Sequence, residues 1–144
     1  MRERRGARVG TVSGLALLTG GTAIAAVAHG TPSVFATVML GLLAAGMSHA
    51  LLTEIQRQAR RGTPGWATQD TVNTALLAAW TAGALLIAVL PTTPSSIRAV
   101  GFLLTIAYAL CCAFFVMERR RIIAATAASK DAAAKTTPRA PTGP

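Results

Sequence analysis

Long apolar runs alternate with short polar stretches along this chain. The four longest apolar runs cover approximately Val9–Ala28, Val34–Thr53, Thr71–Leu90 and Ile97–Met117. About 20 helical residues cross the hydrocarbon core of a bilayer, and backbone groups cannot stay unpaired in lipid. The pattern therefore predicts an all-α integral membrane protein with four transmembrane helices.

The connections between the runs predict how the helices pair. The first two runs are joined by HGTPS and the last two by PTTPSS, while a longer basic loop, residues 54–70, lies between them. Short connections favour antiparallel neighbours, so we expect two helical hairpins that form one four-helix bundle. The chain then divides into a basic N-terminus (1–8), a transmembrane domain (9–117) and a basic tail (118–144). We expect the tail to be helical at first and disordered over its Pro-rich end.

Composition agrees with a membrane location. The chain is 52% hydrophobic and only 13% charged, with a mean hydropathy of +0.50. A water-soluble domain of this size needs more charge to cover its surface. The formal net charge of +9 is therefore a property of the loops and tails, which hold all but one of the 14 Lys and Arg residues.

The positions of the basic residues predict the orientation. The N-terminus, the middle loop and the tail are basic, so the positive-inside rule places both termini on the cytoplasmic side, in the cytoplasmic membrane. The basic clusters have no interleaved aromatic residues and border apolar runs, which favours contact with anionic lipid head groups over nucleic acid. The arginines expected at the head groups are Arg57, Arg60, Arg61, Arg119, Arg120 and Arg121.

The first run has a second interpretation. A basic start, an apolar stretch and AVA before His29 resemble a secretory signal peptide with an A-x-A cleavage site. The run is longer than a typical signal-peptide core of about 7–15 residues, and the next span follows almost at once. We therefore favour an uncleaved helix, with cleavage as the alternative.

Small residues at a spacing of four recur in all four spans. Membrane helices associate where small side chains let their backbones approach. We expect these residues to pack within one bundle, or, for the fourth span, against another copy or a partner helix. The residues expected at helix contacts are Gly10, Gly14, Gly41, Ala45, Ala79, Gly83, Gly101, Thr105 and Ala109.

A few polar side chains fall inside the spans. His49 is an ionisable group in the second span, so it is either a proton-titrating residue or a neutral imidazole bonded across the bundle to Thr53, Thr19 or Tyr108. We favour the structural role, because the span cores contain no acidic residue to support proton transport. The polar intramembrane candidates are His49, Ser48, Thr53, Trp80 and Tyr108. Trp80 and Tyr108 fall at similar depth and are expected to pack as rings inside the bundle.

The chain has no motif that singles out a family, and no paired carboxylates, catalytic triad, phosphate-binding loop or metal-ligand cluster. We expect a non-catalytic membrane protein, without metal or cofactor, that acts through helix–helix association as an accessory or scaffold subunit or as a homo-oligomer. One alternative is a holin-type pore former, a class that includes small multi-span proteins with basic tails. The other is a small transporter or channel that uses His49.

Overall fold

The computed structural model describes residues 3–28, 34–61 and 65–136, with side chains from residue 11 to residue 135 within these ranges. In this part of the chain the backbone forms four α-helices and no strand. They are α1 (Glu3–Ala28), α2 (Val34–Ala59), α3 (Thr68–Val89) and α4 (Ser95–Thr136). The HGTPS connection and the Pro-rich end of the tail lie outside the described residues, and the burial expected for Gly10 stays a prediction because it falls on a residue whose exposure is not described.

The prediction of an all-α fold with four apolar helices is confirmed. Each of the four is long and apolar enough to cross a membrane, which indicates a membrane protein. The shortest, α3, has 22 residues and a length of about 33 Å, close to the thickness of the hydrocarbon core. The longest, α4, has 42 residues and a length of about 63 Å, so it continues well past the bundle.

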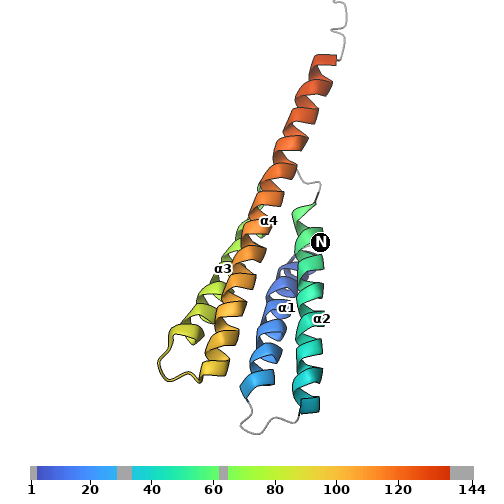
Figure 1. The fold of residues 1–144 in the computed structure, drawn as a ribbon. Helices are drawn as coiled ribbons and strands as arrows, with labels where there is room; N and C mark the ends of the chain where they lie inside the picture. Colours follow the sequence, from blue (N-terminus) through green and yellow to red (C-terminus); the bar gives the residue numbers. More distant parts are fainter. Residues whose placement is uncertain (1–2, 29–33, 62–64, 137–144) are drawn as a thin grey trace, which may run out of the picture.

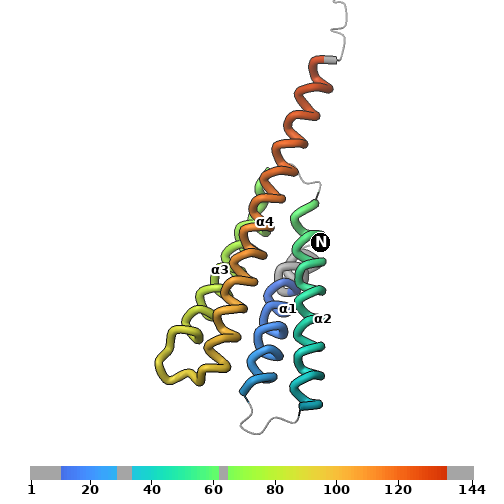
Figure 2. The backbone as a smooth tube through the Cα atoms, in the orientation of Figure 1, coloured from blue at the N-terminus to red at the C-terminus, as the bar shows by residue number. Residues whose placement is uncertain are grey.

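The helices associate in two pairs (Figure 1). The most extensive contacts join α1 with α2 and α3 with α4, and we call these the α1/α2 pair and the α3/α4 pair. Contacts between the pairs are fewer and run from α1 to α3 and α4, and from α2 to α4. Figure 2 shows the axes of the four helices lying side by side, with the chain alternating in direction from one helix to the next. One end of α4 extends beyond the other helices.

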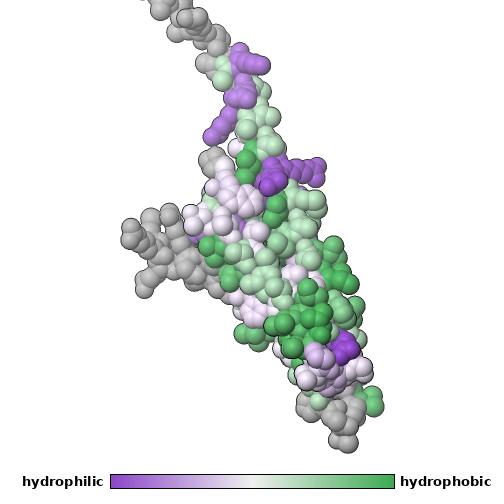
Figure 3. All heavy atoms as spheres, turned by 90° about the vertical axis from the view of Figure 1, so that its left-hand side faces the viewer, coloured by the Kyte–Doolittle hydropathy of each residue, from purple (hydrophilic) through white to green (hydrophobic). Residues whose placement is uncertain are grey.

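The surface of the bundle is mostly apolar. Figure 3 shows hydrophobic residues over the body of the α3/α4 pair and hydrophilic residues along the projecting part of α4. Large side chains such as Phe35, Leu42 and Leu103 are exposed, as expected for helices that contact lipid. The pattern favours a bundle embedded in the membrane with the end of α4 in water.

The buried face of α4 differs from the predicted stripe of small residues. It begins at Gly101 as expected, but continues through larger side chains at spacings of three and four. The buried positions of α4 are Gly101, Leu104, Tyr108, Cys111, Phe115 and Arg119. A strict spacing of four advances by about 40° per step around a helix, so Ala109, two steps beyond Gly101, has rotated to the outside. Thr105, one step along, is half-buried.

Most of the other small residues expected at helix contacts face outwards in a single chain. Gly14 is half-buried, and a methyl group added there would meet no atom within 4 Å. The exposed ones are Gly41, Ala45, Ala79, Gly83 and Ala109. Packing inside one bundle therefore does not account for the small residues on α2 and on the outer face of α3 and α4.

Gly101 is where the backbones of α3 and α4 approach most closely among the described glycines. A Cβ atom on Gly101 would lie 3.1 Å from both the Cβ and the backbone N of Ala88, and 3.2 Å from the carbonyl oxygen of Ala84. Two of these atoms belong to the backbone and cannot rotate away. The contact therefore favours glycine in this position, because a methyl group would force the two backbones apart by a few tenths of an ångström.

We expect Gly101→Ala to destabilise the protein by about 1–3 kcal/mol, because the helices must separate to admit the methyl group. The matched control is Gly83→Ala, since that position is open within 4 Å and alanine favours the helix by up to about 1 kcal/mol. Thermal unfolding in detergent micelles, followed by circular dichroism, measures both. Equal stability of the two variants would contradict the proposed contact.

Candidate functional site: a buried polar cluster and a pocket between the helix pairs

Arg119 of α4 is buried, with only 1% of its surface exposed. Its Nε donates to Oδ2 of Asp70 at 2.9 Å, and its two terminal nitrogens donate to the carbonyl oxygens of Arg61 at 2.6 Å and Gly65 at 2.9 Å. The guanidinium therefore joins α4 to the start of α3 and to the loop that follows α2. Gly65 has φ of +82°, a backbone conformation that favours glycine, and this turn brings its carbonyl to the guanidinium.

Asp70 holds its place through the start of α3. The same oxygen that pairs with Arg119 accepts a hydrogen bond of 2.9 Å from the backbone N–H of Ala67, the residue before the helix. A carboxylate in the first helical turn also interacts favourably with the helix dipole. Asp70 is 2% exposed, so the ion pair is shielded from water.

A chain of amides extends the cluster from α3 to α2. The side-chain Nδ2 of Asn73 donates to Oε1 of Gln58, and both residues are buried. Gln58 Nε2 in turn donates to Glu54 Oε1 at 2.6 Å, and the Glu54 carboxylate accepts two hydrogen bonds from Arg57, at 2.8 and 2.9 Å. The ion pair and the amides together connect α2, α3, α4 and the middle loop at one end of the bundle.

The expectation of head-group contact does not hold for Arg119, because its guanidinium bonds to the protein instead. Arg57, Arg60, Arg120 and Arg121 are exposed as expected for surface residues. Arg61 is half-buried, and its Nη1 donates to Gln69 at 2.7 Å. A buried guanidinium needs a carboxylate and further acceptors, and Asp70 with two backbone carbonyls supplies them.

Sequence reasoning missed Asp70, Asn73 and Gln58 as members of this cluster. Asn73 follows Asp70 by three residues and Leu77 follows Asn73 by four, and all three are buried on the inner face of α3. Such spacing places residues on one helix face. The spacing that puts Asp70 and Asn73 on the Leu77 face of α3 could be read from the sequence. The arginine that pairs with Asp70 could not, because Arg119, Arg120 and Arg121 are chemically identical.

The structure places His49 on the outside of α2. The residue is exposed, and among the described residues the imidazole has no hydrogen-bond partner. Thr53 donates to the carbonyl oxygen of His49 itself, at 2.9 Å, and Ser48 donates to that of Ala44 at 2.8 Å. The expected bonds across the bundle from His49 are therefore absent from the described part of the chain.

Trp80 and Tyr108 connect the α3/α4 pair to α1. Trp80 Nε1 donates to Ser13 Oγ at 3.0 Å, and the Tyr108 hydroxyl donates to the Ala16 carbonyl at 2.6 Å. Both rings line one cavity of about 230 Å³ against α1. A Cβ on Gly20 would lie 2.9 Å from the Tyr108 hydroxyl, so glycine leaves room for this bond.

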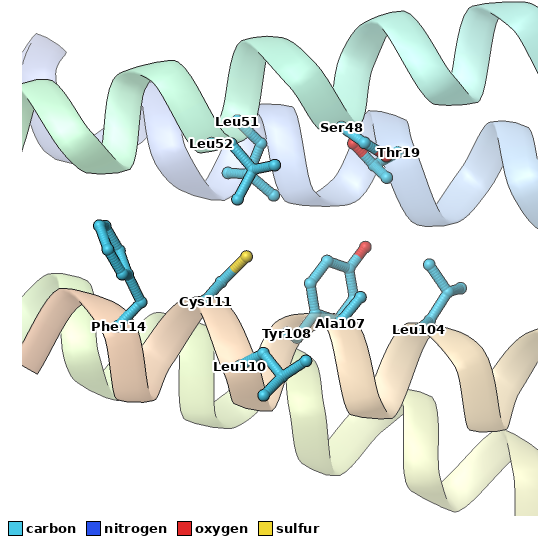
Figure 4. Close-up of a pocket in the computed structure, with 10 residues that line it drawn as sticks. All are labelled: Thr19, Ser48, Leu51, Leu52, Leu104, Ala107, Tyr108, Leu110, Cys111 and Phe114. Carbon is cyan, nitrogen blue, oxygen red and sulfur yellow. The ribbon is translucent and has the colours of Figure 1, made fainter.

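A larger pocket of about 390 Å³ lies between the two helix pairs. Figure 4 shows most of its side chains projecting from both pairs into the space between them, whereas Leu110 lies over the α4 ribbon. The lining is almost entirely apolar, apart from the hydroxyls of Thr19, Ser48 and Tyr108 and the thiol of Cys111. The lining residues are Thr19, Ser48, Leu51, Leu52, Leu104, Ala107, Tyr108, Leu110, Cys111 and Phe114.

We expect Arg119→Met to destabilise the protein by about 3–5 kcal/mol, because it leaves the buried Asp70 carboxylate without its cation. Arg120→Met is the matched control, since the neighbouring arginine is exposed and should tolerate the change. The double variant Asp70→Asn with Arg119→Met should be less destabilised than the sum of the single variants. Thermal unfolding in micelles provides the comparison, and a strictly additive double variant would contradict the ion pair.

Comparison of the chain with protein-family models, with curated proteins and with solved structures gave no match in any of the three. The evidence for a function therefore comes from the chain's own residues. The polar cluster and the bonds of Trp80 and Tyr108 hold the bundle together, while the outer faces and the pocket between the pairs remain open to other molecules.

Proposed function

We propose that this chain is a non-catalytic multi-pass membrane protein that acts through helix–helix association, as an oligomer or as an accessory subunit of a membrane complex. The observation that carries the proposal is a shallow groove of about 520 Å³ on the outer face of the α3/α4 pair. The residues that line this outer groove are Ala78, Thr81, Ala82, Leu85, Ala109, Cys112 and Ala113.

The outer groove suits contact with another helix. Ala78 and Ala82 on α3, and Ala109 and Ala113 on α4, are two pairs of small residues at a spacing of four on neighbouring helices. Large side chains gain nothing over lipid contacts, whereas small ones allow backbones to approach and pack. The small residues that a single bundle leaves outside therefore have a use at an interface.

The occupant we propose for the outer groove is the same groove of a second copy. Copies inserted in one orientation can be related by a two-fold axis along the membrane normal, which places the two grooves at the same depth. A two-fold interface uses one surface on both subunits, so it needs no second complementary surface.

The proposed orientation places the polar cluster and both termini on the cytoplasmic side. Support comes from two basic segments that meet at one end of the bundle, where Arg60 Nε lies 3.3 Å from Glu118 Oε1 and Arg119 reaches the Arg61 carbonyl. The positive-inside rule assigns such an end to the cytoplasm, and its exposed arginines to anionic head groups. The projecting part of α4 then offers a helical surface in the cytoplasm.

A transport role for His49 has less support. A residue that relays protons has to line a path that water or other ionisable groups can reach. His49 is exposed on the outer face of α2 and does not line any of the three cavities described above. Association through the outer groove is therefore better supported than transport.

We expect wild-type protein in liposomes to form dimers or a larger defined oligomer. The double variant Ala109→Leu with Ala113→Leu should raise the dissociation constant at least tenfold, because the leucines keep the backbones apart. Ala45→Leu is the matched control, an exposed alanine on α2 outside the outer groove. Counting photobleaching steps in vesicles at increasing protein-to-lipid ratios measures the oligomer.

A cross-link provides the geometric test. Cys112 lines the outer groove, so in a Cys111→Ala background a short bis-maleimide should join two copies through Cys112 in the membrane. A wild-type chain that stays monomeric at every ratio and gives no cross-link would contradict the proposal. If Ala45→Leu dissociates the oligomer and the double variant Ala109→Leu with Ala113→Leu does not, the interface lies on α2.

A further inference from the structure

The pocket between the helix pairs opens sideways on the bundle. Leu52 of α2 and Leu110 of α4 form its rim and are exposed, 45% and 64% respectively. Thr19, Tyr108 and Leu104 form its inner wall and are buried. A molecule dissolved in the membrane can therefore enter from the lipid between α2 and α4. Its volume of about 390 Å³ is within the usual range for small-molecule sites.

One polar atom in this pocket has no partner. The Oγ1 of Thr19 is buried, the residue is 4% exposed, and no described residue makes a hydrogen bond to or from this oxygen. Its behaviour differs from that of seven other helical Ser and Thr residues, which donate to the carbonyl oxygen four residues back. Those that do so are Thr22, Ser48, Thr53, Thr74, Thr81, Thr105 and Thr126.

The position of Thr19 makes a water partner unfavourable. Thr19 is at the middle of the apolar part of α1, Thr11–Ala28, so its hydroxyl lies near the centre of the hydrocarbon layer. An unpaired polar group in such surroundings is costly, and each one in a native structure calls for an explanation. The other hydroxyls of the pocket are already donors, Ser48 to Ala44 and Tyr108 to Ala16. Among the three hydroxyls of the lining, the O–H of Thr19 is the donor that remains.

We propose that this pocket binds a lipophilic molecule with one carbonyl oxygen, such as a ketone on a hydrocarbon chain. The ligand's carbonyl oxygen accepts a hydrogen bond from the Thr19 hydroxyl. The ligand's hydrocarbon chain lies against Leu51, Leu104 and Phe114. A simple acyl tail would fill the space but leave the hydroxyl unpaired. The ester carbonyls of phospholipids stay near the head groups and do not reach this depth.

This site is separate from the outer groove. The pocket uses Ala107, Leu110 and Cys111 of α4, whereas the outer groove uses Ala109, Cys112 and Ala113. Ligand binding therefore does not depend on the proposed association, and the Ala109→Leu with Ala113→Leu variant should bind the ligand as wild type does. The two proposals can fail independently.

The test uses a long-chain alkyl ketone that carries a photoreactive diazirine, with purified full-length protein in nanodiscs. Saturable labelling should map by mass spectrometry to residues that line the pocket. Unlabelled 2-tridecanone should compete about five- to tenfold better than tridecane, which corresponds to one hydrogen bond to a buried donor. The alkane arm measures how much a plain hydrocarbon chain contributes.

Three variants decide the outcome. Thr19→Val keeps the side-chain shape and should abolish the preference for the ketone while leaving competition by tridecane unchanged. Thr22→Val is the matched control, since its hydroxyl already bonds to the Leu18 carbonyl at 2.7 Å, and it should keep the preference. Ala107→Phe, at an exposed position of the lining, should block labelling altogether.

Several results would overturn the proposal. Labelling that does not saturate, or that maps outside the pocket, would remove the site. An equal preference for the ketone in wild type and in Thr19→Val would show that the hydroxyl is not the recognition element. Equal competition by ketone and alkane in wild type would assign the pocket to plain acyl chains.

Discussion

The buried pair of Arg119 and Asp70 is the interaction on which one end of this bundle depends. A charge cannot be enclosed in an apolar environment without an opposite charge and further hydrogen bonds, and here a single guanidinium has both. Because its partners belong to α3 and to the loop after α2, satisfying this one side chain fixes both of these parts of the chain relative to α4. The amide bond between Asn73 and Gln58 then adds α2 on the same side.

The rest of the bundle is held by different means. Within the α3/α4 pair, Gly101 brings two backbones into contact, and van der Waals packing along the heptad-like faces does the remainder. Between the pairs, Trp80 and Tyr108 each donate a hydrogen bond to α1, and buried apolar side chains from all four helices form a common core. The polar cluster joins the pairs at one end, and the pocket lies between them in the membrane interior.

The sequence predicted some of this structure well and some poorly, for physical reasons. Hydropathy is a local property, so four apolar helices followed directly from the runs. Burial at a given residue depends on the rotational phase of each helix, and three consecutive arginines gave no means to choose Arg119 over Arg120 or Arg121. His49 was ambiguous for the same reason, because its face on α2 is set by the contacts of α2 with α1 and α4.

Thr19 illustrates a further limit. A threonine in an apolar helix ordinarily bonds to its own backbone, and nothing in the sequence distinguishes Thr19 from Thr22 in this respect. The difference arises only in three dimensions, where Thr19 faces the space between the pairs. A pocket of this kind is the space that remains between packed helices. Local sequence patterns cannot predict it, because it depends on how the helices pack.

The unbroken course of α4 has a mechanical consequence. The helix passes from Gly101 through the buried Arg119 to Thr136 with no proline, glycine or kink at the point where it leaves the bundle. A continuous helix transmits torque and tilt along its axis. The outer part of α4 is therefore rigidly connected to the segment that Arg119 bonds to α3 and the loop. The outer end is therefore part of the same rigid helix that forms one wall of the pocket.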